Sequence, residues 1–465
     1  MPSLCHSPKG DLAQRPHRIR SQTEGRVGIL GGGQLAWMLA RAAKDLKWDT
    51  SIFAQSLQES APLAGYDTTL GRFVDSHAIE KWARSVDVVL IESELIPFEP
   101  LSRAMASCGR PIVPSLKALE ISRHKLRQKH LFAKLGIPTA RWFELDEGED
   151  RHPEELLAHL FKVFPTGFVF KWSLGGYDGK GVFVVRPQDL EPASNIPERP
   201  SRASGHGQPK EALLHEVSLF LSTATQNRVP IYVEELVDYL CEGALTAALS
   251  SGSDPEFFSF PMVLSEQDRG TCFRVRSASC HPTLPWNQLE QSAQESAQKI
   301  ARELGFVGTF ALEFFITRNH GLVLNEMAPR VHNSSHFTQI VPGASQFHQH
   351  LRACLGLSMA QPSYPPFYGM TNILGPDSYE GPVTSCPEIP VQNLSGRATG
   401  GHLLVAGVQI PETAVFWYDK PASRPRRKLG HLHSCALTLE ALQSDFATID
   451  QALSRWHDSL TRQQH

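Results

Sequence analysis

An apolar strand, three glycines and an amphipathic helix follow one another near the start of the chain and constrain its fold most. Residues 26–30 are RVGIL, glycines occupy 31–33, and apolar side chains then recur at helical spacing from Leu35 to Ala42. A second strand ends with SIFA at 51–54, and another apolar strand ends in acids at 86–94. Because parallel strands need helical crossovers, this alternation predicts an α/β fold with a doubly wound sheet.

The glycine turn also matches part of a dinucleotide-binding pattern. Gly31, Gly33 and Ala36 fit G-x-G-x-x-G/A, but the second strand has no acid at its tip to bind ribose hydroxyls. An NAD-dependent oxidoreductase is therefore disfavoured. The turn either holds another phosphate or polar ligand at the helix N-terminus or serves only as a tight connection.

Composition narrows the function of this 465-residue chain. The net charge of −3 gives no general attraction to nucleic acid or to an anionic membrane, and no run of about 18 apolar residues predicts a membrane helix. None of the eight cysteines forms C-x-x-C, so we expect free thiols in a reducing, cytoplasmic compartment. Residues 1–25 are expected to form a disordered tail, with an organelle transit segment as the alternative.

A glycine-rich loop follows an apolar strand in the stretch FKWSLGGYDGKG. Lys171 lies near the end of the strand and Lys180 lies in the loop. The glycines, which leave backbone amides open to an anion, are Gly175, Gly176, Gly179 and Gly181. Two lysines so close to the turn favour polyphosphate binding over an ordinary β-hairpin, in which glycine and Asp-Gly are also common.

Two carboxylates on neighbouring strands predict a metal site. Glu313 and Glu326 are thirteen residues apart on two apolar strands, and a hairpin would bring them together with Asn325 beside them. Oxygen ligands of this kind suit Mg²⁺ that already carries nucleotide phosphates. Without a cation, two buried carboxylates would repel each other at considerable cost.

Two further groups of polar residues have more than one interpretation. Glu234, Glu235 and Glu242 surround an apolar strand and would either bind a ribose and an adenine amine or form a solvated edge. His332 and His336 are four residues apart, but they lack the helical H-E-x-x-H context of a zinc site. Substrate contact or hydrogen bonding within the loop is the preferred role of these histidines.

A basic run lies near the C-terminus. Its members are Lys420, Arg424, Arg426, Arg427 and Lys428. Such a run is usually a solvated loop, and only a phosphate site nearby would favour a binding role.

In combination, these motifs resemble those of one ligase family. They are GILGGGQL, the Lys171 strand with GGYDGKG, Glu313-Phe314, NEMAPRVHNSSH, SQFHQHLR and a late Y-x-K followed by RPRRKLGH. Their order over residues 27–433 is similar to that of the 5-(carboxyamino)imidazole ribonucleotide synthase family of ATP-grasp ligases, which act in purine biosynthesis. The resemblance implies an ATP-grasp fold with an N-terminal Rossmann-like (pre-ATP-grasp) domain and a small C-terminal β-rich domain.

The resemblance also implies a reaction and its cofactor. ATP, bicarbonate and 5-aminoimidazole ribonucleotide would give the N5-carboxy product, ADP and phosphate. Mg²⁺, or Mn²⁺ in its place, would be held by Glu313 and Glu326. The residues implied to act on the reacting groups are Arg330, His332, Asn333, Asp178 and Lys420.

The remaining implied contacts fall into two sets. The residues implied to bind ATP are Lys125, Lys171, Gly176, Tyr177, Gly179, Lys180, Gly181, Glu234, Glu235, Leu236, Val237, Glu242, Asn325 and Glu326, and the loop 176–182 would close over ATP as a lid. The residues implied to bind the ribotide are Gln34, Leu35, Glu92, Tyr177, Arg427 and Lys428.

The expected organisation is a tail over 1–25, a Rossmann-like domain over 26–118, an ATP-grasp domain over 119–383, a β-rich module over 384–436 and a C-terminal helix over 437–465. Within the ATP-grasp domain we expect a lid over about 166–240 and a loose insertion over about 186–227. The family implies a homodimer that acts on small molecules and needs neither nucleic acid nor a membrane.

Some positions depart from the family pattern. His124 replaces an Asp, Leu249 replaces an Arg, and Gln267 stands where the family has a His. These departures keep two alternatives open: an ATP-grasp ligase with a different amine acceptor, and a non-catalytic descendant that binds nucleotide.

Overall fold

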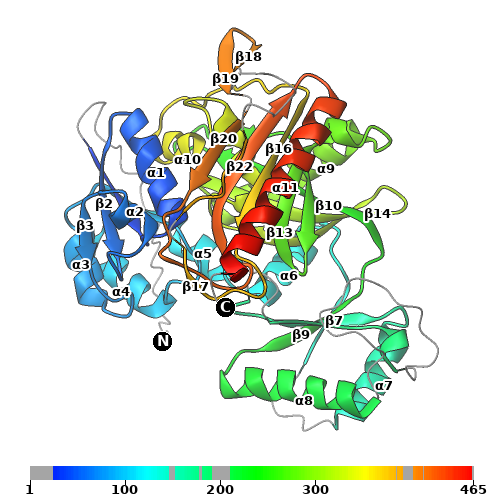
Figure 1. Ribbon diagram of the computed structural model, residues 1–465. Coiled ribbons are helices and arrows are strands. Elements are labelled where there is room, and N and C mark those ends of the chain that lie inside the picture. The colour runs from blue at the N-terminus through cyan, green and yellow to red at the C-terminus, as the bar shows by residue number, and fades with distance from the viewer. Residues whose placement is uncertain are drawn as a thin grey trace, which may run out of the picture.

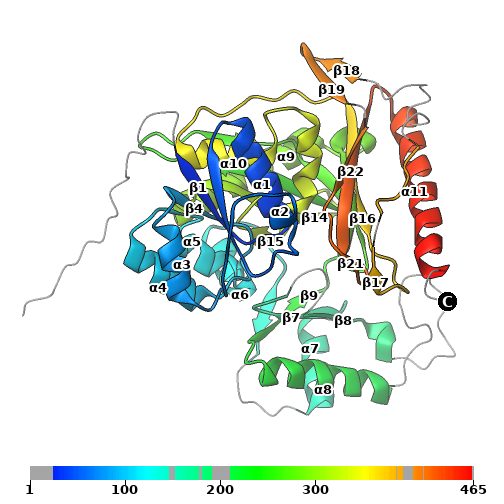
Figure 2. The ribbon, with the colours of Figure 1, turned by 60° about the vertical axis from the view of Figure 1, so that its left-hand side comes forward.

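Three sheets contain most of the strands in the part of the chain that the structure describes. The computed structural model describes residues 25–145, 152–176, 181–190, 210–383, 385–390, 402–411 and 413–462. An N-terminal parallel sheet lies beside a large sheet, and a small antiparallel sheet lies below both (Figures 1 and 2). Two short strand pairs complete the described part: β17 (Gly381–Pro382) with β21 (Ala422–Ser423), and β18 (His402–Val405) with β19 (Val408–Pro411).

The N-terminal sheet confirms the doubly wound α/β prediction. Its parallel strands follow the order β3-β2-β1-β4-β5. Side chains alternate along β1, so that Ile29 joins the core beneath α1 while Leu30 joins the core beneath α3 and α4 on the other face. The bounds are β1 Arg26–Leu30, β2 Asp49–Ala54, β3 Thr68–Leu70, β4 Val88–Ile91, β5 Ile112–Val113, α1 Gln34–Asp45, α2 Ser60–Leu63, α3 Ser76–Ala83, α4 Phe98–Cys108 and α5 Leu116–Ser122.

The small sheet covers the range expected for a lid, about 166–240, with two differences. Its order is β6-β9-β7-β8, so it begins at β6, before residue 166. The expectation of a loose insertion over 186–227 is wrong for its second half, because Leu213 and Val217 anchor α8 in the core of this sheet. Residues 191–209 lie outside the described residues. The bounds are β6 Trp142–Glu144, β7 Phe168–Trp172, β8 Val182–Val185, β9 Ile231–Glu235, α7 Pro153–Val163, η1 Pro187–Leu190 and α8 Lys210–Gln226.

The large sheet combines strands that we expected in separate domains. Its path is β15-β14-β10-β12-β13-β16-β22-β20, with β11 paired to β10. β20 and β22 therefore do not form an independent module within 384–436, because β22 pairs along its whole length with β16 and is buried from Leu429 to Ala436. The bounds are β10 Tyr239–Leu249, β11 Phe257–Ser259, β12 Val263–Asp268, β13 Thr271–Ser277, β14 Gly308–Thr317, β15 Leu322–Ala328, β16 Phe367–Leu374, β20 Thr413–Trp417 and β22 Lys428–Ala436.

Helices cover the large sheet and join it to the N-terminal sheet. α9 (Trp286–Leu304) packs with β10 and β14, and α11 (Leu439–Arg462) packs with β16 and β22 at the side of the molecule in Figure 2. α10 (Gln346–Leu355) shares a core with α1. The other helices are α6 Lys125–Lys134, η3 Ala278–Cys280 and η4 Asn333–Ile340. Within the described ranges, no helix is long and apolar enough to cross a membrane.

Candidate functional site

The two carboxylates predicted to bind a metal face each other across a hairpin. Glu313 of β14 and Glu326 of β15 are register partners, and a β-bulge follows Glu313. The ammonium of Lys125, at the start of α6, lies 2.5 Å from Glu326. The imidazole Nε2 of His332 lies 3.7 Å from Glu313. The hairpin therefore brings both acids together as the sequence spacing predicted.

The charges around this hairpin favour an additional cation. Burial raises the pKa of Glu313, and the nearby charge of Glu326 raises it further. Burial would also raise the pKa of Glu326, but the neighbouring positive charges, Lys125 first and then Lys171, together lower it. A divalent cation would therefore lower the cost of ionising Glu313.

The donor set fits Mg²⁺ better than a transition metal. Glu313, Glu326 and Asn325 offer only oxygen ligands, which Mg²⁺ prefers. Among the described residues, no group of three or more His, Cys, Asp or Glu side chains could hold a metal ion by itself. A cation here would need further oxygen ligands from a bound phosphate or from water.

A second set of charges lies next to the metal hairpin. Lys171, at the end of β7, lies 2.6 Å from Glu234 Oε2 on β9 and donates a 3.0 Å hydrogen bond to Asn325. Lys129, on α6, lies 2.6 Å from the other oxygen of Glu234. We call the six charged residues Lys125, Lys129, Lys171, Glu234, Glu313 and Glu326 the carboxylate–lysine cluster.

Lys129 is a site residue that the sequence reasoning missed. A lysine in an amphipathic helix usually faces solvent, and Lys129 is only 1% exposed. Its spacing was a usable signal, because residues four apart lie on the same face of a helix and Lys125 was already a candidate.

The other predicted residues near β9 and β10 differ in their contacts and burial. Side chains alternate along β9, and Glu235 pairs with Arg141 at 2.7 Å, away from Lys171. Leu236 and Val237 are half-buried just after β9. Glu242 accepts a 3.0 Å hydrogen bond from Tyr239, and burial raises its pKa. Glu235 therefore does not face the cluster, whereas Glu242 is close enough to raise the pKa of Glu313.

The glycine-rich loop joins β7 and β8, which pair as an antiparallel hairpin from Lys171 and Val182 onward. Gly181 has φ +71°, and a Cβ there would lie 2.9 Å from Trp172, so glycine is required. Gly176 lies at the start of the loop. The predicted residues Tyr177, Asp178, Gly179 and Lys180 lie outside the described residues.

Arg330 is held by an acid from the N-terminal sheet region. Its guanidinium donates to both oxygens of Glu94, at 2.5 and 2.9 Å. Burial would raise the pKa of Glu94, but the charge and hydrogen bonds of Arg330, together with a backbone hydrogen bond, lower it. Glu94 was not predicted as a site residue, although Glu92, two positions earlier, was predicted to contact the ribotide.

Glu92 has a structural role that the sequence did not predict, and its contact with a ribotide stays a prediction. Its carboxylate accepts hydrogen bonds from the backbone amides of Gly33, at 2.8 Å, and Ala36, at 2.7 Å. Glu92 therefore caps the N-terminus of α1 and fixes the glycine turn. Gln34 and Leu35, which begin α1, remain half-buried.

The segment after Arg330 is fixed by amide side chains. The backbone of His332 exchanges hydrogen bonds with the Gln346 amide at 2.7 and 2.8 Å. Asn333 and Asn372 form a reciprocal amide pair at 2.9 and 2.7 Å. Burial, with the charges of Arg330 and Lys428, lowers the pKa of His332 to about 3. His332 is therefore neutral near pH 7.

We call residues 418–428 the basic loop, and it reaches the same region. Lys428 is close enough to act on the pKa values of His332 and Glu313. Lys420 donates to the Lys428 carbonyl at 2.8 Å, and Arg427 donates to the Ala422 carbonyl at 2.8 Å. The loop therefore lies beside the hairpin of Glu313 and Glu326, and its binding role stays a prediction.

The departures from the family pattern fit their surroundings. His124 precedes α6, and its Nδ1 accepts a hydrogen bond from the Arg127 amide at 3.4 Å, so it occupies the N-cap position that suits Asp. Gln267 donates to Ser265 at 2.8 Å. Leu249 is 9% exposed and packs in the main core.

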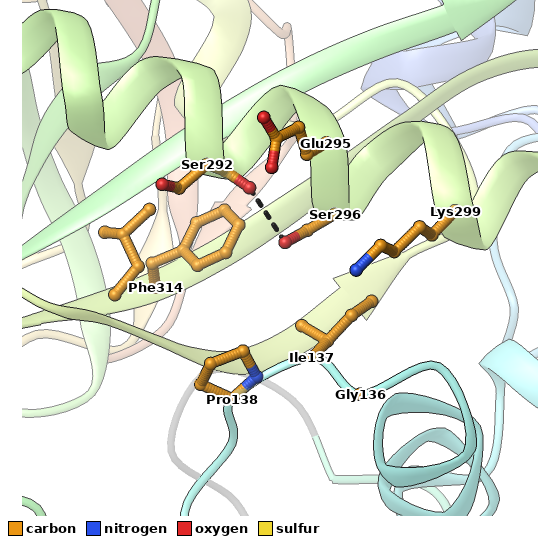
Figure 3. A pocket seen from close by; sticks show the side chains of 9 residues that line it. Gly136, Ile137, Pro138, Ser292, Glu295, Ser296, Lys299 and Phe314 are labelled. Carbon is orange, nitrogen blue, oxygen red and sulfur yellow. Dashed lines mark hydrogen bonds between the residues drawn. The ribbon is translucent and has the colours of Figure 1, made fainter.

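One cavity lies apart from these residues. It has a volume of about 230 Å³, and Phe314 lines it from β14 (Figure 3). Its lining residues are Gly136, Ile137, Pro138, Ser292, Glu295, Ser296, Lys299, Phe314 and Leu322. None of the predicted site residues lines this cavity.

Comparison with protein families matches three parts of the chain. Residues 25–123 match the ribonucleotide synthetase preATP-grasp domain, and residues 196–347 match the ATP-grasp domain. Residues 369–445 match the phosphoribosylaminoimidazole carboxylase C-terminal domain. The three matches support the ATP-grasp fold with its N-terminal and C-terminal domains.

Known relatives cover most of the chain. The N5-carboxyaminoimidazole ribonucleotide synthase of Mycobacterium leprae is 31% identical over 410 residues, 88% of this chain and 83% of that protein. The carboxyaminoimidazole ribonucleotide synthase from Aspergillus clavatus, solved with ATP, has a TM-score of 0.72 and 26% identity over 93% of this chain and 99% of that one. The Thermus thermophilus synthetase has a TM-score of 0.68 and 26% identity over 92% of this chain and 98% of that one.

Proposed function

The chain belongs to the N5-carboxyaminoimidazole ribonucleotide synthase family, and we propose that it performs the reaction implied by that family. It would use ATP to carboxylate the 5-amino group of 5-aminoimidazole ribonucleotide with bicarbonate and release ADP and phosphate, in purine biosynthesis. One observation carries this proposal: the facing pair Glu313 and Glu326 lies within a set of lysines and next to the Arg330 segment.

The carboxylate–lysine cluster supports an ATP phosphate site. Lys125 and Lys171 would contact phosphate oxygens, and Glu313, Glu326 and Asn325 would hold Mg²⁺ or Mn²⁺. The bound cation would neutralise the charge that develops on the transferred phosphoryl group. Catalysis here would consist chiefly of positioning and electrostatic stabilisation.

The residues beside the cluster would act on the acceptor. Arg330, oriented by Glu94, would stabilise the activated carboxylate, and neutral His332 with Asn333 would face the aminoimidazole. Lys428, Lys420 and Arg427 would hold the ribotide phosphate opposite Gln34 and Leu35. The loop 176–182, with Tyr177, Asp178 and Lys180, would close over ATP as a lid.

Two wider features belong to the same proposal. We infer a homodimer that acts in the cytoplasm, on the basis of family membership. The net charge of −3 supports small-molecule substrates rather than nucleic acid or anionic membranes as partners.

Transfer of labelled bicarbonate tests the proposal. The purified protein is mixed with ATP, Mg²⁺, ¹³C-bicarbonate and 5-aminoimidazole ribonucleotide, and the product is identified by mass spectrometry. We expect labelled carbon on the ribotide with one ADP formed per product, and loss of both when EDTA removes the cation. ADP formation without label on the ribotide would instead favour a ligase with another amine acceptor.

A further inference from the structure

Lys129 and Glu234 are almost completely removed from solvent. Lys129 is 1% exposed and Glu234 is 2% exposed. Burial of an unpaired charge is very unfavourable, so both groups need partners. Their contacts show how the charge is distributed around Lys171.

The Glu234 carboxylate is shared between two lysines on different elements. Lys129 of α6 lies 2.6 Å from Oε1, and Lys171 of β7 lies 2.6 Å from Oε2. Lys129 also donates to Thr139 at 2.7 Å, and Thr139 donates to the Leu324 carbonyl at 2.7 Å. Lys171 donates to Asn325, the next residue on β15. Lys129 thus links α6 to the small sheet and to the metal hairpin.

The charges of this group explain why two lysines are needed. One carboxylate and two ammonium groups carry a net charge of +1. Burial would raise the pKa of Glu234, but Lys171 and then Lys129 outweigh burial and lower it. If Lys129 were absent, Glu234 and Lys171 would form a neutral pair, and Lys171 would offer no net charge to an anion.

We propose that Lys129 is a positioning residue that neutralises Glu234 and so keeps the positive charge of Lys171 available for nucleotide phosphates. The identity of the ligand rests on the proposed function. The alternative is that Lys129 only fills space and stabilises the junction of α6 with the two sheets. The two roles differ in how they depend on the charge of Glu234.

A double-mutant cycle with nucleotide binding as the readout separates these roles. The variants are Lys129→Met, Glu234→Gln and Lys129→Met/Glu234→Gln, and the Kd for Mg²⁺-ADP is measured by calorimetry with the melting temperature alongside. Lys129→Met should weaken binding about tenfold or more, the scale of one unit charge near a phosphate. The double variant restores the +1 charge and should return to within about threefold of the unchanged protein.

Weak nucleotide binding by the double variant would overturn the proposal. If the double variant binds as weakly as Lys129→Met, or more weakly, Lys129 does not act through Glu234. If Lys129→Met does not fold, a folded double variant with affinity near that of the unchanged protein still supports the proposal, and one with more than tenfold weaker binding contradicts it.

A control variant and the binding of the unchanged protein complete the test. Lys134→Met makes the same substitution on the same helix, where the Lys134–Glu303 pair at 2.7 Å is exposed, and it should leave the Kd unchanged. Failure of the unchanged protein to bind Mg²⁺-ADP would count against the proposed function. Normal binding by both the unchanged protein and Lys129→Met would count against the role of Lys129 alone.

Discussion

The carboxylate–lysine cluster and the basic loop use their positive charges differently. In the cluster, Lys125, Lys129 and Lys171 each pair with a carboxylate from a distant segment. In the basic loop, Lys420 and Arg427 donate to backbone carbonyls of the same loop. A backbone carbonyl fixes a cation in place without cancelling its charge. The cluster therefore depends on a balance between its lysines and carboxylates, whereas Lys420 and Arg427 are held in place by backbone carbonyls of their own loop.

The largest loss of activity should follow from changing the balance of charges within the carboxylate–lysine cluster. Glu326→Gln removes a proposed metal ligand and the partner of Lys125 together. We expect ADP formation to fall roughly 100-fold or more, the scale of losing a preorganised electrostatic group. Steady-state rates measure the change, and Glu303→Gln, in an exposed pair, serves as the control. Near-normal turnover by Glu326→Gln would exclude the metal role.

A smaller loss of activity should follow when the contact between Arg330 and Glu94 is weakened. Glu94→Gln keeps the size of the side chain but removes the charge that faces the guanidinium. Loss of one partner of a half-buried pair costs about 2 kcal/mol or more, which corresponds to roughly 30-fold in kcat. Glu80→Gln disrupts an exposed pair with Arg84 and should have almost no effect. Equal rates for the two variants would show that Glu94 does not orient Arg330 for catalysis.

The basic loop should affect one substrate only. Lys428→Ala removes a charge that acts on His332, but it leaves the contacts of Lys171 with Glu234 and Asn325 in place. We expect the KM for the ribotide to rise roughly tenfold, with the nucleotide Kd within about twofold. Initial rates at varied ribotide and calorimetry with Mg²⁺-ADP measure the two quantities. A fall in nucleotide affinity instead would place Lys428 with the cluster.

The smallest effect should come from Arg426, which holds the basic loop to the β12–β13 turn. Its guanidinium lies 2.8 Å from Asp268, whose side chain is 54% exposed. Because an exposed ion pair contributes about 0.2–1 kcal/mol, Arg426→Ala should raise the KM for the ribotide by about threefold at most. The same rate measurements test this, and 0.5 M salt should reduce the difference. A change as large as that of Lys428→Ala would mean that Arg426 contacts the substrate itself.

Local patterns in the sequence were sufficient to predict that Glu313 and Glu326 face each other on one hairpin. Glu313 and Glu326 lie on two apolar strands with a short connection, so the pairing follows from nearby residues alone. The helix α1 and the glycine turn were predictable for the same reason, because apolar spacing and glycine act locally. The basic loop could be proposed as a binding element only through the family resemblance.

Contacts between distant segments account for what the sequence did not reveal. The carboxylate that pairs with Lys129 lies on β9, far away in the sequence. A lysine in a helix is normally expected to face solvent. The capping of α1 by Glu92 was not predicted, because Glu92 is more than 50 residues away from Gly33 and Ala36 in the sequence. β22 was assigned to a separate module because its pairing with β16 depends on long-range register rather than on local pattern.

The most direct test of the whole account is ADP release coupled to the ribotide. The purified protein is supplied with Mg²⁺-ATP and bicarbonate, and ADP formation is followed with and without 5-aminoimidazole ribonucleotide. We predict strong stimulation by the ribotide, and loss of most of that stimulation in Lys428→Ala at low ribotide concentration. No stimulation of a protein that binds Mg²⁺-ADP would contradict the account and favour a descendant that retained nucleotide binding without the carboxylation chemistry.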